Sequence, residues 1–138
     1  MPAEGTFGVL VVGDVIGRTG RAALKRHLPA LRKKYGPAFV VANGENAAGG
    51  AGMTEDVGRE MFALVDVLTS GNHIWDKKEG IPYLEREPRL LRPANYPPGN
   101  PGRGSVVVEG GEGAGRVALA VLNLQGRVFM EALDCPFR

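Results

Sequence analysis

Three apolar segments in the first half of the chain are each followed at once by a cluster of polar residues. The segments are Phe7–Val12, Ala38–Ala42 and Val65–Ser70, and valine is prominent in all of them. Short runs of this kind, separated by helical sequence, are typical of parallel strands that are buried on both faces. The alternation of strands and helices therefore predicts a β-α-β-α-β unit with right-handed crossovers.

The polar clusters contain residue types that bind metal ions. In open α/β sheets the loops at the carboxyl ends of the strands form the ligand crevice. We therefore expect four side chains from the three clusters to converge on one rim of the sheet, namely Asp14, Glu45, Asn72 and His73. Two carboxylates, an amide oxygen and an imidazole gathered at one rim would make half of a metal centre.

Helices are predicted between and after these strands. An apolar stripe at spacings of three and four residues predicts a helix from about Arg21 to Tyr35. Gly17 and Gly20 are expected to loosen the backbone before it. Thr54 is a good N-cap for a second helix because its hydroxyl can accept a hydrogen bond from a free backbone donor. A shorter helix is expected near Ile81–Arg86.

The sequence changes character beyond residue 88. Leu90-Leu91 predicts a short strand, and a loop rich in proline and glycine follows. Ser105–Glu109 and Arg116–Leu122 flank the glycine-rich link Gly110–Gly115 and predict an antiparallel hairpin. The expected fold class is thus α/β, with a parallel β-α-β-α-β core followed by a hairpin. Residues 1–138 would form a single domain.

Composition favours a soluble, cytoplasmic protein. The net charge is only +2, and the densest basic stretch, Arg21–Lys34, is expected to be the solvated face of a helix rather than an extended nucleic-acid surface. Cys135 is the single cysteine, which favours a reducing compartment. No apolar run approaches the roughly 20 residues that span a bilayer, so no membrane partner is expected.

The carboxylates suit hard metal ions, although each has an ordinary alternative role. Asp14 offers an anionic oxygen suited to Mn, Fe or Mg, but aspartate also caps turns through its own side chain. Glu45 has two oxygens that could bridge two cations, or it could be a surface acid. Asn43 and Asn46 could bind metal or order their loop.

Gly71-Asn72-His73 is the most informative cluster. An asparagine oxygen is a weak neutral ligand. The next residue is a histidine, the side-chain type that most often transfers protons at neutral pH. His73 is therefore our candidate general acid. His27 lies among basic residues on a predicted helix, and we assign it no role.

A nucleotide-binding half-domain is the alternative interpretation. Gly13, Gly17 and Gly20 follow the first strand and precede a helix, where a phosphate could bind free backbone donors. However, the dinucleotide motif requires a glycine where Val15 stands. A non-catalytic module that binds nucleotide or phosphate at the same rim remains open.

Five segments, in this order, resemble the YmdB-like branch of the calcineurin-like metallophosphoesterases. They are Gly13–Arg18, Asn43–Ala48, Gly71–Lys78, Arg92–Pro97 and Asn123–Arg127. The resemblance implies the N-terminal half of a layered α/β/β/α sandwich around two metal ions, iron or manganese. It also implies hydrolysis of phosphodiesters, notably 2′,3′-cyclic nucleotides such as 2′,3′-cyclic AMP.

The resemblance also implies roles for individual residues. Asp14 matches the ligand of the first metal, and Glu45 matches the bridging carboxylate. Asn46 and Asn72 match ligands of the second metal, and His73 matches the proton donor to the leaving group. The resemblance assigns no substrate-binding residue.

One departure from the family changes what we expect of this chain. Family members are longer, and their remaining ligands are histidines in the second half, whereas this chain contains only His27 and His73. We therefore expect an incomplete domain, either a fragment, a truncated reading frame or a degenerate homologue, that binds metal weakly and is inactive alone. We also expect one apolar face of the hairpin to be exposed, namely Val106, Val108, Leu119 and Val121, which would favour a homo-oligomer.

Overall fold

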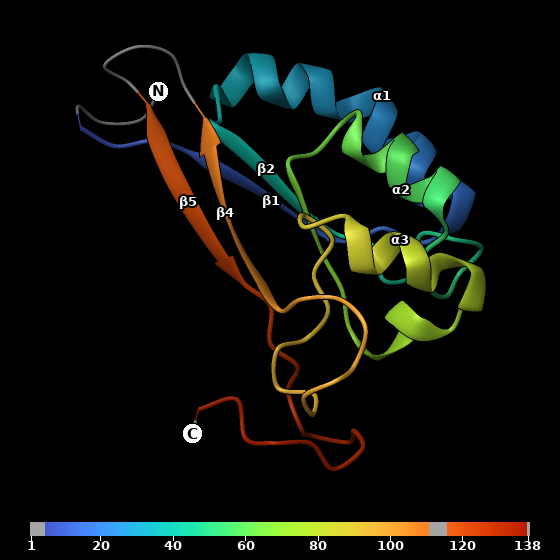
Figure 1. Ribbon diagram of the computed structural model, residues 1–138. Coiled ribbons are helices and arrows are strands. Elements are labelled where there is room, and N and C mark those ends of the chain that lie inside the picture. The colour runs from blue at the N-terminus through green and yellow to red at the C-terminus, as the bar shows by residue number, and fades with distance from the viewer. Residues whose placement is uncertain (1–4, 111–115, 138) are drawn as a thin grey trace.

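The computed structural model describes residues 5–110 and 116–137 and has the predicted architecture (Figure 1). Strands β1 (Val9–Asp14), β2 (Phe39–Asn43) and β3 (Val67–Thr69) form a parallel sheet in the order β1-β2-β3. Helices α1 (Gly17–Tyr35) and α2 (Glu55–Phe62) connect them. The parallel β-α-β-α-β core predicted from the sequence is therefore confirmed.

The helices cover one face of the parallel sheet, as Figure 1 shows. Val40, Ala42 and Leu68 point from the sheet into a core cluster that they share with Leu28 of α1 and Met61 of α2. All five residues are nearly or completely buried. This cluster fixes the helices on the sheet and so fixes the directions in which the strands end.

The hairpin of β4 (Ser105–Gly110) and β5 (Val117–Leu122) packs on the opposite face, over β2 and β3 (Figure 1). Its strands pair antiparallel from Ser105 opposite Leu122 to Gly110 opposite Val117, as predicted. Most of the predicted glycine-rich link, residues 111–115, lies outside the described residues. Helices, parallel sheet and hairpin thus form successive α, β and β layers.

The sequence predicted that one apolar hairpin face would be exposed, and this prediction was wrong. The four side chains of that face pack against Val41, Val67 and Leu91, on the hairpin side of the parallel sheet. These four are Val106, Val108, Leu119 and Val121. Because side chains alternate between the faces of a strand, the outer face is the one left open. Val107 and Leu122 are 66% and 60% exposed on it.

Helix α1 begins earlier than predicted and includes both glycines that we expected to precede it. Gly17 opens the helix with a left-handed φ of 54°, which glycine adopts without a steric penalty. Gly20 packs against Val15, where an added Cβ would lie 3.2 Å from the Val15 carbonyl carbon. The glycines therefore allow the first helical turn to lie close to the end of β1.

The remaining elements follow the predictions more closely. Helix α2 starts after Thr54, whose hydroxyl accepts a hydrogen bond from the Val57 backbone N–H at 3.4 Å. Helix α3 spans Ile81–Arg86. Instead of a strand, Leu90 and Leu91 form isolated bridges, to Leu68 and Arg103. Within the described ranges, no helix is both long and apolar enough to cross a membrane.

Candidate metal centre

The carboxyl ends of the three parallel strands meet at one edge of the sheet. The Cα atoms of Asp14 and Asn43 are register partners, and Asn43 is in turn the partner of Thr69. The β1 register shifts between Val12 and Asp14, which marks an irregularity just before the aspartate. The three polar clusters therefore start side by side, as the parallel arrangement predicts.

Asp14 and Asn46 are in direct contact. The Asn46 Nδ2 group donates a hydrogen bond to Asp14 Oδ2 at 2.7 Å. The Asn46 carbonyl accepts hydrogen bonds from the Gly17 and Gly50 N–H groups at 2.9 and 3.1 Å. These bonds fasten the loop after β2 to the start of α1. Since the Nδ2 group of Asn46 donates to Asp14, Oδ1 is the atom of this amide that could accept a bond or bind a metal ion.

Glu45 lies against the residue that precedes Asn72. A Cβ added at Gly71 would lie 2.7 Å from the Glu45 Cδ and 2.8 Å from its Oε1, and closer still to Oε2. No side chain larger than hydrogen fits there while the carboxylate keeps this position. The Glu45 backbone is fixed too, because its N–H donates to Asn43 Oδ1 at 3.1 Å and the Gly44 N–H donates to the Thr69 carbonyl at 2.9 Å.

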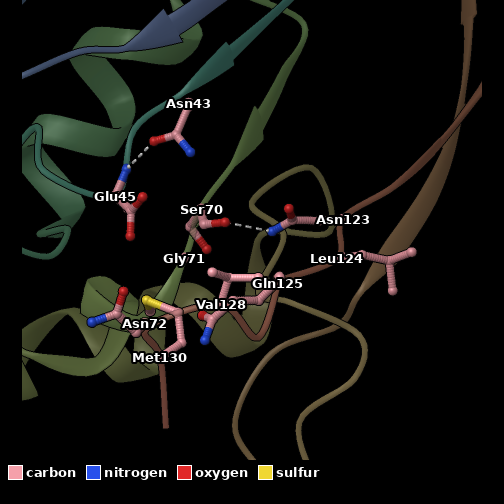
Figure 2. Close-up of a pocket in the computed structure, with 11 residues that line it drawn as sticks. Asn43, Glu45, Ser70, Gly71, Asn72, Asn123, Leu124, Gln125, Val128 and Met130 are labelled. Carbon is pink, nitrogen blue, oxygen red and sulfur yellow. Dashed lines mark hydrogen bonds between the residues drawn. The ribbon is translucent and has the colours of Figure 1, made fainter. Parts of the chain in front are cut away.

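A pocket of about 460 Å³ opens beside this contact (Figure 2). Its lining comes from the ends of β2, β3 and β5 and the segment after β5, and comprises Asn43, Glu45, Ser70, Gly71, Asn72, Asn123, Leu124, Gln125, Gly126, Val128 and Met130. Asp14 and Asn46 are not among the lining residues. Glu45, next to Asn46 in the sequence, is thus the residue that brings a carboxylate to the pocket that contains Asn72.

The donor atoms at this edge fit a hard metal ion. The Glu45 Oε2 atom is buried and has no hydrogen-bond partner among the described residues. A buried carboxylate oxygen without a partner is costly unless a cation or donor satisfies it. Asp14 adds a second carboxylate, and Asn46 and Asn72 add neutral amide oxygens, which is the oxygen chemistry that Mn and Mg prefer.

The set of strong metal ligands on this chain is small. Across residues 5–110 and 116–137, no group of three or more histidine, cysteine, aspartate and glutamate side chains is placed to hold a metal ion. The ligand roles predicted for Asp14, Glu45, Asn46 and Asn72 therefore stay predictions. If they bind metal, a complete site needs further ligands.

His73 lies on the 3₁₀ helix η1 (Asn72–Trp75), directly after Asn72. Its Nδ1 atom is 2.7 Å from Asp76 Oδ2. A carboxylate only accepts hydrogen bonds, so the proton of this bond belongs to Nδ1 and the Nε2 atom remains for a ligand. The i,i+3 spacing of His73 and Asp76 could have indicated this partnership from the sequence, and sequence reasoning missed it.

Asn123 was also missed as part of the site. It follows β5, is buried, and its Nδ2 donates to the Ser70 and Leu91 carbonyls at 2.9 and 3.2 Å. The Ser70–Asn123 bond is visible in Figure 2. The Ser70 hydroxyl also donates to the Leu91 carbonyl at 2.6 Å. These buried bonds hold the backbone immediately before Gly71 and thus the residues predicted to bind metal. The position of Asn123 directly after a predicted strand was the signal available in the sequence.

The chain is similar to several known proteins. The family model described as YmdB-like protein matches residues 10–138. The 2′,3′-cyclic-nucleotide 2′-phosphodiesterase of Bacillus subtilis (strain 168) is 46% identical over 130 residues, which cover 94% of this chain and 48% of that protein.

Two solved structures have the same fold. A hypothetical protein from Thermus thermophilus matches with a TM-score of 0.81 and 43% identity, over 94% of this chain and 49% of its own. A novel phosphatase from Mycoplasma pneumoniae matches with a TM-score of 0.82 and 30% identity, over 94% of this chain and 47% of its own. The chain spans about half the length of the curated relatives that it matches over most of its own length. On the family-model match and these likenesses, the chain belongs to the YmdB-like protein family.

Proposed function

We propose that this chain is the N-terminal half of a dinuclear metal-dependent phosphodiesterase that acts on 2′,3′-cyclic nucleotides. The observation that supports this most directly is the Glu45 carboxylate. It lies against Gly71, lines the same pocket as Asn72, and has a buried oxygen with no partner among the described residues. The relative from Bacillus subtilis is named for a reaction of this class.

In this proposal Asp14 would help to hold the first metal ion, Glu45 would serve both ions, and Asn46 and Asn72 would help to hold the second. Iron or manganese is the proposed metal. Bound metal ions would supply Lewis acidity toward the phosphate. The chain itself positions Glu45 through the bonds that fix the loop after β2. The buried Asn123 side chain holds the backbone that leads to Gly71 and Asn72.

His73 is the proposed general acid. The Asp76 carboxylate accepts a hydrogen bond from Nδ1–H. A protonated His73 imidazole would therefore present Nε2–H to the ribose oxygen that departs from phosphorus. The 45% exposure of the His73 side chain leaves this nitrogen open to a ligand. Asp76 would then be a positioning residue, since it acts through the imidazole.

The site is proposed to be complete only when a second set of ligands joins it. Its donors on this chain are all oxygen atoms, two of them neutral, and borderline metals favour imidazole as well. We therefore expect weak metal binding and little activity from the chain alone. The exposed outer face of the hairpin is a proposed surface for self-association or for the complementing half.

We propose a cytoplasmic location, because Cys135 is the single cysteine and a reducing compartment suits such a chain.

The competing proposal is a non-catalytic module that binds nucleotide or phosphate at the same rim. The small number of strong ligands among the described residues favours it. The two proposals differ in their need for metal, because a binding module requires none. Metal analysis therefore separates them.

The test is complementation. The second half of the Thermus thermophilus relative, expressed separately, is added to this chain with Mn²⁺, and hydrolysis of 2′,3′-cyclic AMP and bound manganese are measured. We expect the mixture, but neither half alone, to bind metal and turn over substrate. The variant Glu45→Gln should abolish both, whereas Glu85→Gln on α3 should change neither. A mixture that forms a stable complex yet binds no metal would contradict the proposal.

A further inference from the structure

A second cavity adjoins the pocket of about 460 Å³ beside Glu45, which we call the metal pocket, and shares lining residues with it. The shared residues are Asn72, Gln125 and Met130. The cavity has a volume of about 360 Å³, within the range of small-molecule sites, and His73 also lines it. A ligand held beside Asn72 and His73 therefore has a neighbouring compartment for another of its groups.

Aromatic side chains form one wall of this cavity. The rings of Trp75 and Tyr96 meet edge to face with their centroids 4.6 Å apart. The Trp75 Nε1–H already donates to the Pro101 carbonyl at 3.3 Å, so the indole offers mainly its apolar surface to a ligand. Met130 adds a polarisable thioether at the cavity. Surfaces of this kind suit a flat heteroaromatic ring.

Gln125 contributes a polar group whose orientation is fixed. Its backbone is clamped by Asn95, which accepts from the Gln125 N–H at 2.9 Å and donates to the Gln125 carbonyl at 3.0 Å. The Tyr96 hydroxyl lies 3.3 Å from the Gln125 Oε1 atom and donates to it. The amide therefore presents Nε2 as its remaining group. Gln125 is only 8% exposed, and Nε2 has no hydrogen-bond partner among the described residues.

We infer that this second cavity is a nucleobase subsite. The base packs against Trp75 and Tyr96, and Gln125 Nε2 donates a hydrogen bond to a ring nitrogen or carbonyl oxygen of the base. Figure 2 shows Gln125 beside Val128 and Met130, in the same group of residues as Asn72 and Glu45. The link between this subsite and a phosphate at the metal pocket rests on the proposed function, whereas binding of the base itself needs no metal.

The only tryptophan of the chain lines the cavity, which gives a direct test. Trp75 fluorescence of the 138-residue chain is measured during titration with adenosine in the presence of EDTA. We expect saturable quenching by adenosine and none by ribose 5-phosphate. Gln125→Met should weaken adenosine binding roughly three- to ten-fold, the usual effect of losing one hydrogen bond. Arg127→Ala, at an exposed neighbour that lines neither of these two cavities, should change it less than about two-fold.

Circular dichroism verifies that each variant is folded. Gln125→Glu serves as a second variant, because it keeps an oxygen for the Tyr96 hydroxyl and removes the N–H donor. Equal adenosine affinity in the parent and both Gln125 variants, or no saturable quenching, would overturn the inference. Adenosine binding in EDTA without metal-dependent hydrolysis in the complementation assay would support the subsite and count against the proposed function. Hydrolysis without adenosine binding would support the proposed function and count against the subsite.

Discussion

The carboxylate of Glu45 lies so close to the α-carbon of Gly71 that a methyl group there would be 2.8 Å from Oε1. Gly71→Ala should therefore displace the carboxylate and lower the free energy of unfolding by about 1–3 kcal/mol. It should also weaken Mn²⁺ binding by the complemented protein by at least about ten-fold, measured by isothermal titration calorimetry. Gly126→Ala is the matched control, because an added Cβ at that pocket glycine meets nothing within 4 Å. Reduced stability with unchanged metal affinity would show that Glu45 is not a ligand.

Asn123 should be important for stability although it lies outside the predicted ligand set. Replacement by leucine leaves the Ser70 and Leu91 carbonyls without the buried amide donor. We expect a loss of about 2–3 kcal/mol in the free energy of unfolding, measured by urea denaturation. Asn100→Ala removes an exposed bond to the Pro97 carbonyl and should cost less than about 0.5 kcal/mol. Equal effects of the two variants would contradict the buried role of Asn123.

Substitutions of His73 and Glu45 should have different effects on metal content and turnover in the complemented protein. His73→Ala should retain metal and lower turnover of 2′,3′-cyclic AMP about 10²- to 10⁴-fold, because it removes a general acid. Glu45→Ala should lose metal, because one carboxylate is proposed to serve both ions. Metal content by mass spectrometry and turnover by chromatography distinguish the two. Equal metal loss in both variants would identify His73 as a ligand instead.

Acid should weaken an interaction between Glu87 and Arg89. Burial acts to raise the pKa of the Glu87 carboxyl, but hydrogen bonds from the Arg89 side chain and backbone outweigh it, and the pKa is lowered below its ordinary value of 4.5. A lowered folded-state pKa stabilises the fold above the unfolded-state pKa, and this stabilisation is lost as the pH falls through the folded-state value. Glu87→Gln should therefore flatten the decline in stability below about pH 4.5, whereas Glu85→Gln at an exposed position should not. An unchanged acid profile in Glu87→Gln would refute this.

The two faces of the hairpin should respond differently to charge. Val106 packs toward Val41, Val67 and Leu91, so Val106→Lys should lower the free energy of unfolding by about 2–3 kcal/mol. Val107 is on the outer face, and Val107→Lys should leave stability within about 0.5 kcal/mol while reducing self-association, measured by analytical ultracentrifugation. Similar destabilisation by both changes would mean that the outer face is also covered in solution.

The sequence predicted the strands and their polar ends well, because a parallel sheet brings successive carboxyl ends to one edge whatever the details of packing. It could not determine which hairpin face is buried. Val106 and Val108 alternate with Val107, and apolar residues lie on both faces, so only the position of the hairpin over Val41 and Val67 decides. The start of α1 was misplaced for a similar reason. The close approach of Gly20 to Val15 is a tertiary contact that a local pattern does not contain.

The candidate site was also predicted only in part. The order of the strands predicted its location, and the residue types predicted its candidate ligands. The contacts that hold these residues in place could not be predicted, because those of Asn123 with Ser70 and of Glu45 with Gly71 join segments that are far apart in sequence. Which buried asparagine faces which carbonyl depends on the three-dimensional packing of all the layers.

Strand β1 stands at one end of the sheet order, with β2 as its neighbour, and its last residue is Asp14. A strand that joins the sheet at this edge would bring its own side chains next to that carboxylate. Extension of the sheet and capture of a metal ion would then be thermodynamically linked, and each would strengthen the other by the same factor. The affinity of this chain for a complementing half would therefore rise with free Mn²⁺ and fall with a chelator, so the available metal would regulate assembly.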